Sequence, residues 1–287
     1  MKQFIKLLIP PIFLLLYRKL HRQAWKYNGC YASFSEAEQH SEGYDAPQIV
    51  NKVLDSTRKV MAGEAAFERD SMLFYHEEYN YNVLMPLYRI ALEKGRLHVL
   101  DFGGALGSTF RQHLKLLKPA IQDLSWNIVE QQSFLEAAKE INCEEGLHFF
   151  DSIEKTLESA PIDVVLFLSV LQYLENPQEI IEKIKSIPYI IIDIHPEFLT
   201  REKPLFTVQN VSEPIYNASY PLKIWGKGEL LTMFSENYEL LGSWKIKYDY
   251  MQKIKDENGT AEKIEFIGML LKKKDVNTSG EKGFLYG

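Results

Sequence analysis

The segment VLDFGGALGSTF, residues 99–110, places an acid and a cluster of glycines at the end of an apolar run. Asp101 is followed by Gly103, Gly104 and Gly107, and then by residues with a helical pattern. Glycine lets the backbone turn sharply and lets a ligand approach with no Cβ in the way. An acid is suited to a cationic group, and backbone N–H groups at a helix start are suited to an anionic one. The segment therefore predicts a ligand-binding turn between a strand and a helix.

Acidic residues also end the next two apolar runs. Glu130, followed by Gln131, closes WNIVE, where a carboxylate can accept hydrogen bonds from both hydroxyls of a ribose. Asp151 and Ser152 follow LHFF. Asp151 can accept a hydrogen bond from an amino group, whereas an acid or serine before a helix is also a capping pattern. Both roles can hold, with Asp151 binding and Ser152 capping.

Two classes of ligand use a glycine-rich turn of this kind. The dinucleotide fingerprint G-x-G-x-x-G needs glycine at position 102, which is Phe102, so a nicotinamide-dependent oxidoreductase is disfavoured. The frame that fits is D-x-G-x-x-x-G, made by Asp101, Gly103 and Gly107. This frame resembles motif I of class I S-adenosylmethionine-dependent methyltransferases.

The resemblance implies a role for each of these positions. Asp101 and the glycine loop would bind the amino-acid end of S-adenosyl-L-methionine, and Glu130 with Gln131 would bind its ribose. Asp151 with Ser152 would lie at the adenine. The segment DVVLFLSVLQYLENP (163–177) also resembles the family. Ser169, Val170 and Leu171 of this segment would pass beneath the cofactor. Gln172 and Tyr173 would point toward its methyl group.

A narrower resemblance extends over nearly the whole chain. GEAAFERDSMLF, IVEQ and IYNASYP, taken together with motif I, are similar to a family of methyltransferases assigned to bacterial surface-polysaccharide (O-antigen or capsule) loci. It implies an enzyme that methylates a small molecule or a sugar during cell-envelope polysaccharide biosynthesis.

A hydroxyl or amine acceptor needs a base to take its proton. Methyltransferases of this class often carry a histidine near position 172, which is Gln172 here, so we look for the base after the strand YIIIDI. His195 is the first candidate there, and Asp193 or Glu197 the alternatives. The stretch 194–226 is rich in proline and aromatic residues and is predicted as a long acceptor-side loop without regular structure. Its Tyr220 and Trp225 either stack on the acceptor or pack in the core.

Positioning these residues requires a sheet whose strands end at one edge. Five apolar runs of strand length alternate with helical stretches and predict parallel strands at 97–102, 126–130, 147–150, 163–169 and 189–194. The fold class is therefore α/β, a Rossmann-like doubly wound sheet. Residues 238–250 and 263–274 predict a C-terminal antiparallel hairpin, which matches the antiparallel seventh strand of methyltransferases.

The remaining sequence divides around that sheet. Residues 61–95 are predicted as a helical lid in which Glu64, Glu68, Arg69 and Asp70 form surface ion pairs at helical spacing or contact the acceptor. The predicted domains are an irregular N-terminal extension (1–60), the lid (61–95), the methyltransferase domain (96–272, with an insertion at 194–226) and a disordered tail (273–287).

Composition limits the classes of function. The formal net charge of −6 argues against a general nucleic-acid binder. The two cysteines and seven histidines show no metal-ligand spacing, so no metal is expected. Residues 1–22 are apolar and then basic, and the apolar run is too short to span a membrane. They either dock on the protein or contact a membrane surface, which predicts a cytoplasmic protein or a peripheral one at the inner face. A non-catalytic scaffold stays open as an alternative, and the oligomeric state stays undetermined.

Overall fold

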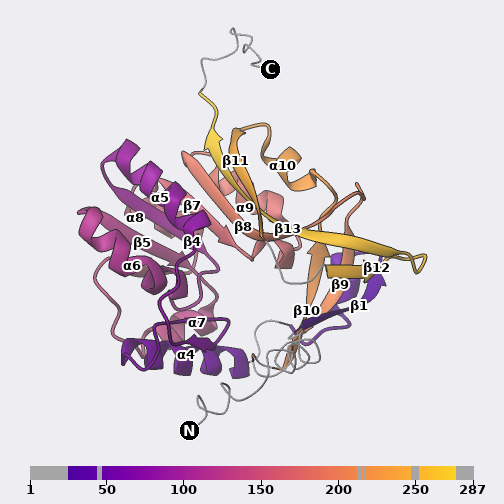
Figure 1. The fold of residues 1–287 in the computed structure, drawn as a ribbon, viewed down its shortest axis with the longest axis horizontal. Coiled ribbons are helices and arrows are strands. Elements are labelled where there is room, and N and C mark those ends of the chain that lie inside the picture. The colour runs from indigo at the N-terminus through magenta and orange to yellow at the C-terminus, as the bar shows by residue number, and fades with distance from the viewer. Residues whose placement is uncertain (1–24, 44–46, 212–214, 216, 247–251, 276–287) are drawn as a thin grey trace, which may run out of the picture.

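The computed structural model describes residues 25–43, 47–211, 215, 217–246 and 252–275. A mixed sheet forms its centre, with strand order β11-β13-β8-β7-β4-β5-β6 and β12 paired to β13 (Figure 1). Its strands are β4 (Leu97–Phe102), β5 (Leu124–Val129), β6 (Leu147–Phe150), β7 (Val164–Leu168), β8 (Tyr189–Phe198), β11 (Tyr238–Ile246), β12 (Gln252–Lys255) and β13 (Ala261–Lys273). All five strands expected from the apolar runs are present.

The order of the strands creates a switch point beside β4. Strands β4 to β8 are parallel to one another, and the chain moves outward from β4 first to β5 and β6 and then to β7 and β8. Strand β13 pairs antiparallel with both β8 and β11, so the expected antiparallel strand near the C-terminus is confirmed. In such a sheet, ligands bind outside the carboxyl ends of the strands where the order reverses.

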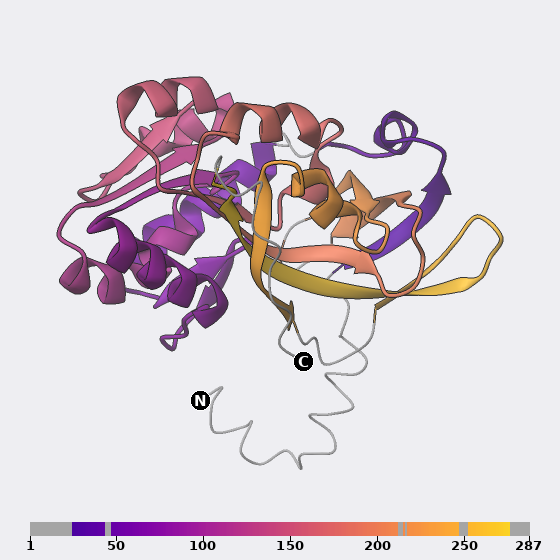
Figure 2. The ribbon, with the colours of Figure 1, turned by 90° about the horizontal axis from the view of Figure 1, so that it is seen from above.

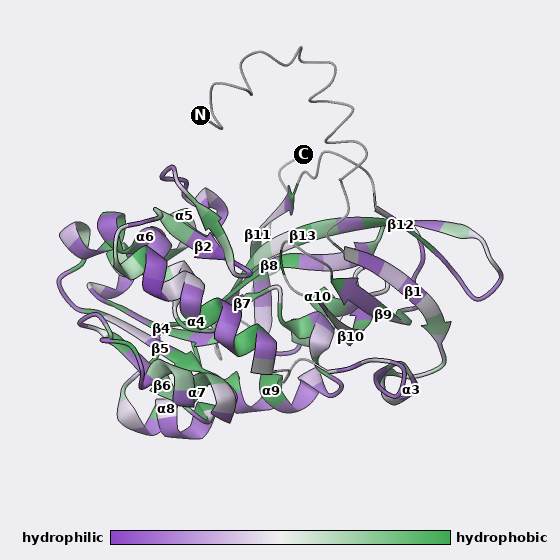
Figure 3. Cartoon of the chain, turned by 90° about the horizontal axis from the view of Figure 1, so that it is seen from below, coloured by the Kyte–Doolittle hydropathy of each residue, from purple (hydrophilic) through white to green (hydrophobic). Residues whose placement is uncertain are grey.

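Helices cover both faces of the sheet, which makes the domain a doubly wound α/β fold. The helices are α4 (Pro47–Met61), α5 (Tyr81–Lys94), α6 (Ser108–Ala120), α7 (Gln132–Ala138), α8 (Ile153–Ser159), α9 (Pro177–Ile184) and α10 (Glu229–Phe234). Figure 3 shows mainly hydrophobic strands between helices whose outer sides carry hydrophilic residues.

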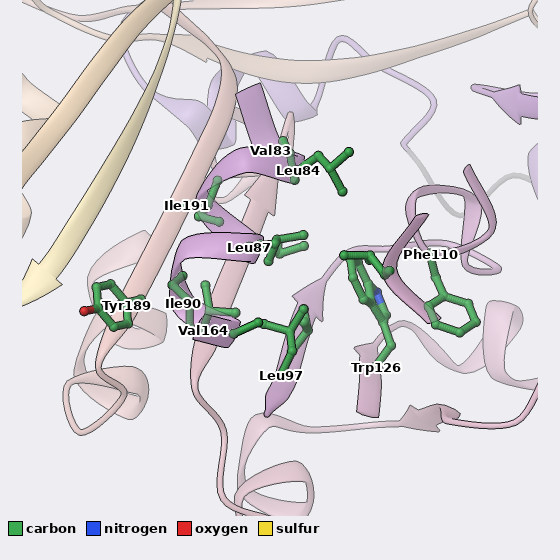
Figure 4. Close-up of a cluster of buried hydrophobic side chains, with 14 of the residues drawn as sticks. Val83, Leu84, Leu87, Ile90, Leu97, Phe110, Trp126, Val164, Tyr189 and Ile191 are labelled. Carbon is green, nitrogen blue, oxygen red and sulfur yellow. The ribbon is translucent and has the colours of Figure 1, made fainter. Parts of the chain in front are cut away.

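Alternation along the strands builds two separate cores. Side chains of a strand point to opposite faces in turn. Val164 and Leu166 accordingly join the core under α5 and α6, whereas Val165 and Phe167 join the core under α8, α9 and α10. Figure 4 shows the first core, in which Leu87 and its neighbours on α5 meet the sheet.

A second sheet stands beside the carboxyl edge of the first (Figures 1 and 2). It contains β1 (Trp25–Tyr31), β9 (Leu205–Val211) and β10 (Ala218–Ile224), all antiparallel, and the short helix α3 (Phe34–Glu38) contacts it. The prediction of a loop over 194–226 is therefore wrong, as is the prediction of irregular structure for the described part of the extension 1–60. Strands β1 and β9 pair across more than 170 positions of sequence, and no local pattern reports such a pairing.

The segment expected to be a helical lid is only partly helical. Helix α5 ends at Gly95 as predicted, with a left-handed φ of 71°. Residues 67–74, however, form the hairpin β2 (Phe67–Arg69) and β3 (Met72–Phe74). The domain boundaries proposed from the sequence stay predictions.

The predicted membrane-contacting segment 1–22 and most of the predicted tail lie outside the described residues. Within the described part of the chain, none of the helices has both the length and the apolar character that a membrane crossing requires.

Substitutions on α5 test the core. Leu87 is fully buried against the sheet, whereas Leu92 on the same helix is 85% exposed. We expect L87A to lower the free energy of unfolding by about 2–5 kcal/mol, because it leaves a cavity in a packed core. L92A should change it by less than about 0.5 kcal/mol. Urea denaturation measures both, and equal losses would contradict the packing described here.

Candidate functional site

A cavity of about 790 Å³ opens at the carboxyl ends of β4, β5, β7 and β8. Its opposite wall comes from the second sheet and from the β2–β3 hairpin. Most residues that the sequence singled out line it: Asp101, Gly103, Gly104, Glu130, Gln131, Asp151, Ser152, Ser169, Val170, Tyr173 and Asp193. Gly107 and His195 are not among the lining residues.

The glycines shape the turn between β4 and α6. Gly103 has a left-handed φ of 73°, and a Cβ there would lie 2.8 Å from Val170 Cγ2. A Cβ on Gly104 would lie 2.6 Å from Asp101 Oδ2. Gly107 caps α6 with a φ of 92°. Its role is thus to start the helix rather than to face the cavity.

Asp101 lies beneath this loop and is 1% exposed. The indole Nε1–H of Trp126 donates to its Oδ2 at 3.0 Å. The pKa of Asp101 is raised to about 7, mainly by burial; the Trp126 hydrogen bond opposes this shift, and the nearby Glu130 carboxylate contributes to it. A cationic group in the cavity would favour the ionised form.

Glu130 faces the same loop from the end of β5. The backbone N–H of Ala105 donates to Glu130 Oε1 and that of Gln131 to Oε2, both at 2.9 Å. These hydrogen bonds hold the carboxylate at the cavity wall.

Asp151 and Ser152 lie at the far end of the cavity, after β6. Ser152 is the N-cap of α8, and its hydroxyl oxygen accepts from the backbone N–H of Lys155 at 3.4 Å. Asp151 is exposed and pairs with the Lys155 ammonium, which lowers the pKa of Asp151. The predicted capping role of Ser152 is confirmed, whereas the binding role of Asp151 stays a prediction.

The segment after β7 forms the cavity floor. Ser169 has a φ of 60°, and its hydroxyl accepts a hydrogen bond from Gln172 Nε2 at 2.9 Å. The Tyr173 hydroxyl donates to Gln209 Oε1 on β9 at 3.0 Å. The Tyr173 ring meets Tyr220 edge-on, with ring centroids 5.1 Å apart. Tyr173 therefore joins the first sheet to the second.

Asp193 is the centre of a buried polar network. It is 2% exposed, and it accepts hydrogen bonds from Trp244 Nε1 and Asn80 Nδ2, each at 2.7 Å. The backbone N–H of Asn80 donates to His113 Nε2 at 3.1 Å, and His113 Nδ1 lies 2.8 Å from Thr109 O. Burial raises the pKa of Asp193.

Asn80 and His113 line the cavity, and sequence reasoning did not find them. They come from the start of α5 and the middle of α6, and only the fold brings them together. His113 Nε2 accepts a hydrogen bond, so the proton is assigned to Nδ1 and the ring is neutral.

His195 does not face the cavity, which corrects its prediction as the acceptor-side base. A bulge at Asp193–Ile194, opposite Gly268, changes which face the following residues of β8 occupy. His195 is 1% exposed and packs against Trp225, and burial lowers its pKa to about 3. Trp225 is likewise a core residue.

The β2–β3 hairpin brings Glu68 to the start of α6. Glu68 is 4% exposed, and it accepts hydrogen bonds from the Ser108 hydroxyl and from the backbone N–H of Ser71. Burial, and then the charge of Asp70, raise the pKa of Glu68 to about 7. The expected helical surface ion pairs are therefore wrong, because Glu68 is a buried cavity residue on a strand.

Carboxyl groups outnumber cations around the cavity. The cations are Arg69 and Lys183. The carboxyl groups belong to Glu68, Asp70, Asp101, Glu130, Asp151, Glu154 and Asp193. This balance favours a ligand with net positive charge. Among the described residues, no group of three or more His, Cys, Asp or Glu side chains is arranged to hold a metal ion.

Comparisons with known proteins give no family. Neither a protein-family model nor a curated protein matches the chain. Among solved structures, the N-terminal domain of EvdMO1 with SAH bound has 13% identity and a TM-score of 0.43, covering 77% of this chain and 96% of that one. An S-adenosylmethionine-dependent methyltransferase from Clostridium acetobutylicum ATCC 824 has 10% identity and a TM-score of 0.40, covering 77% and 98%. At these identities and TM-scores the likeness supports no conclusion about this chain. The fold assignment rests on the strand order of the sheet.

Gly104 offers a direct test of the loop. G104A places a methyl group against the Asp101 carboxyl, so we expect a loss of about 1–3 kcal/mol in stability and a distorted cavity wall. G242A is the matched control, because a Cβ there meets nothing within 4 Å. Chemical denaturation compares the two variants, and an unchanged G104A would show that the loop does not rest on Asp101.

The raised pKa of Asp101 predicts a pH dependence of stability. The folded state holds this proton more tightly than the unfolded chain, whose pKa is near 3.8. The contribution is therefore complete below pH 3.8 and is lost as pH rises through about 7. We expect D101N to be less sensitive than wild type to a change from pH 5 to pH 8, measured by urea denaturation. D55N, at an exposed site on α4, should keep the wild-type slope, and an equal slope for D101N would contradict the assignment.

Proposed function

We propose that this protein is a methyltransferase that uses S-adenosyl-L-methionine as its cofactor. The observation that carries the proposal is that Asp101 and Glu130, at the ends of neighbouring parallel strands, reach one cavity around a glycine loop. The sequence frame of that loop resembles motif I of class I methyltransferases.

The residues present fit this cofactor in charge and shape. S-adenosyl-L-methionine carries an ammonium, a sulfonium and a carboxylate, so it has a net positive charge, as the acidic cavity requires. Gly104 leaves no room for a Cβ, and the loop backbone itself forms the wall. Glu130 with Gln131 would hold the ribose, and Asp151 the adenine amino group.

The chain's main task is alignment. The cofactor supplies a methyl group on a sulfonium, which is already a good leaving group. The protein has to hold an acceptor oxygen or nitrogen in line with that methyl, and such positioning supplies much of the rate. From the segment after β7, Val170 would contact the cofactor and Tyr173 would border the acceptor.

Asp193 is the base that the geometry supports. It lines the cavity, whereas His195 does not. Its raised pKa makes it a stronger proton acceptor than an ordinary carboxylate. Trp244 and Asn80 fix its two oxygens, and the remaining lone pairs can accept a proton from the acceptor.

We assign the acceptor to the small molecules or sugars of cell-envelope polysaccharide biosynthesis, in the cytoplasm. The support is the narrower sequence resemblance and the polar and aromatic wall of the second sheet, with Gln209 and Tyr220 on the cavity. Mass spectrometry of envelope glycans from a strain lacking the gene would show whether one methyl group is lost. Unchanged glycans would remove this acceptor class.

Cofactor binding is tested by calorimetry with S-adenosylmethionine and S-adenosylhomocysteine. Wild type should bind both, and E130Q should bind at least about tenfold more weakly, because an amide has one accepting oxygen and no charge. E136Q, on the exposed side of α7, is the control and should bind as wild type does. If wild type binds neither compound, the proposed function is wrong.

A further inference from the structure

Arg69 is a cation in the cavity that the proposed roles leave unused. It ends strand β2, and its guanidinium carbon lies 5.8 Å from the ring centroid of Phe67 and 5.9 Å from that of Phe74. The two rings stack on each other at 4.5 Å with an interplanar angle of 2°. They hold the guanidinium by cation–π contact, which leaves its N–H donors available for a ligand.

Arg69 has no acidic partner among the described residues, whereas other basic residues do. The second cavity cation, Lys183, pairs with Glu154 at 2.9 Å. Several arginines elsewhere also form ion pairs with carboxylates, namely Arg58, Arg96, Arg111 and Arg201. Arg69 is an exposed residue in the cavity lining. A guanidinium with no paired carboxylate offers donors in a planar fork suited to two oxygens of one anion.

The turn after Arg69 is held in an unusual conformation. Asp70 and Ser71 form a two-residue turn with φ values of 49° and 62°, and each such non-glycine residue costs on the order of 1–3 kcal/mol. Two hydrogen bonds hold the turn in this conformation. The Ser71 N–H donates to Glu68 at 3.0 Å, and the Ser56 hydroxyl donates to Ser71 O at 2.8 Å. The fold therefore fixes the backbone next to Arg69.

Arg69 also acts electrostatically on acids of the cavity. Burial raises the pKa values of Glu68, Asp70 and Asp193, and the positive charge of Arg69 opposes that rise at each of them.

We propose that Arg69 is a binding site for an oxyanion, a carboxylate or a phosphate, on a ligand of this cavity. This inference rests on the proposed function, since the reaction would bring two ligands that could carry the oxyanion. One source is the carboxylate of S-adenosylmethionine, and the other is an acidic group on the acceptor.

The cofactor source is tested with R69Q and two adenosyl compounds. 5′-Methylthioadenosine lacks the amino-acid group of S-adenosylhomocysteine but keeps the rest. If Arg69 binds the cofactor carboxylate, calorimetry will show R69Q losing at least about tenfold in affinity for S-adenosylhomocysteine and none for 5′-methylthioadenosine. R69K keeps the charge without the planar fork, and should fall between wild type and R69Q.

The acceptor source is tested with inorganic phosphate added to protein saturated with S-adenosylhomocysteine. If Arg69 binds an acceptor oxyanion, phosphate will raise the Tm of wild type and not of R69Q, and both proteins will bind S-adenosylhomocysteine equally. R58Q removes an exposed arginine outside the cavity lining and should behave as wild type in both experiments.

The outcomes separate this inference from the function it rests on. If R69Q and R69K match wild type with both adenosyl compounds and with phosphate, Arg69 binds no oxyanion. If wild type binds neither adenosyl compound, the methyltransferase proposal fails, and phosphate titration of the protein alone still tests Arg69. R69K also guards against a folding defect of R69Q, which circular dichroism would reveal.

Discussion

The contact between the glycine loop and the Asp101 carboxyl fixes the geometry of the whole site. The backbone at Gly104 rests so closely on Asp101 that a methyl group would not fit between them. Trp126 holds the carboxyl from below, and the loop N–H of Ala105 reaches Glu130 on the next strand. Two neighbouring strand ends and the helix start after Gly107 are therefore locked into one wall. Any ligand of the cavity meets backbone at that wall.

The acids of the cavity are buried in surroundings that disfavour their charged forms. Burial disfavours the ionised forms of Asp101, Glu68 and Asp193, and it raises the pKa of each. A positively charged ligand reverses this penalty by pairing with carboxylates already in place. The same arrangement disfavours anions except at a dedicated donor, and Arg69 is the cation placed for that purpose. The same buried acids would therefore select a ligand by its charge and hold it in position.

The cavity is closed by elements that lie far from the motifs in sequence. Strands β9 and β10 follow β8, yet β9 pairs with β1 from the N-terminal part of the chain on one side and with β10 on the other. The hairpin β2–β3 reaches α6 through the Glu68–Ser108 hydrogen bond. Strand β8 continues beyond its pairing with β7 while it stays paired with β13, after a bulge that turns Asp193 and His195 to different surroundings. The acceptor side therefore depends on long-range pairing, whereas the loop side depends on one strand–turn–helix unit.

The sequence alone determined the parallel strands, the glycine turn and the acids at the strand ends. Those features are local: apolar runs such as VVLFL form buried strands, and Gly103 and Gly107 mark backbone that turns through positive φ. Tertiary structure alone decided that His195 is a core residue and Asp193 a cavity residue. A single bulge reversed the alternation that the sequence suggests. Tertiary structure also decided that residues 67–70, FERD, form a strand and a turn rather than a helix. The partners of Glu68 and Arg69 lie on α6 and across the hairpin, and a spacing rule within one segment cannot report contacts made between segments.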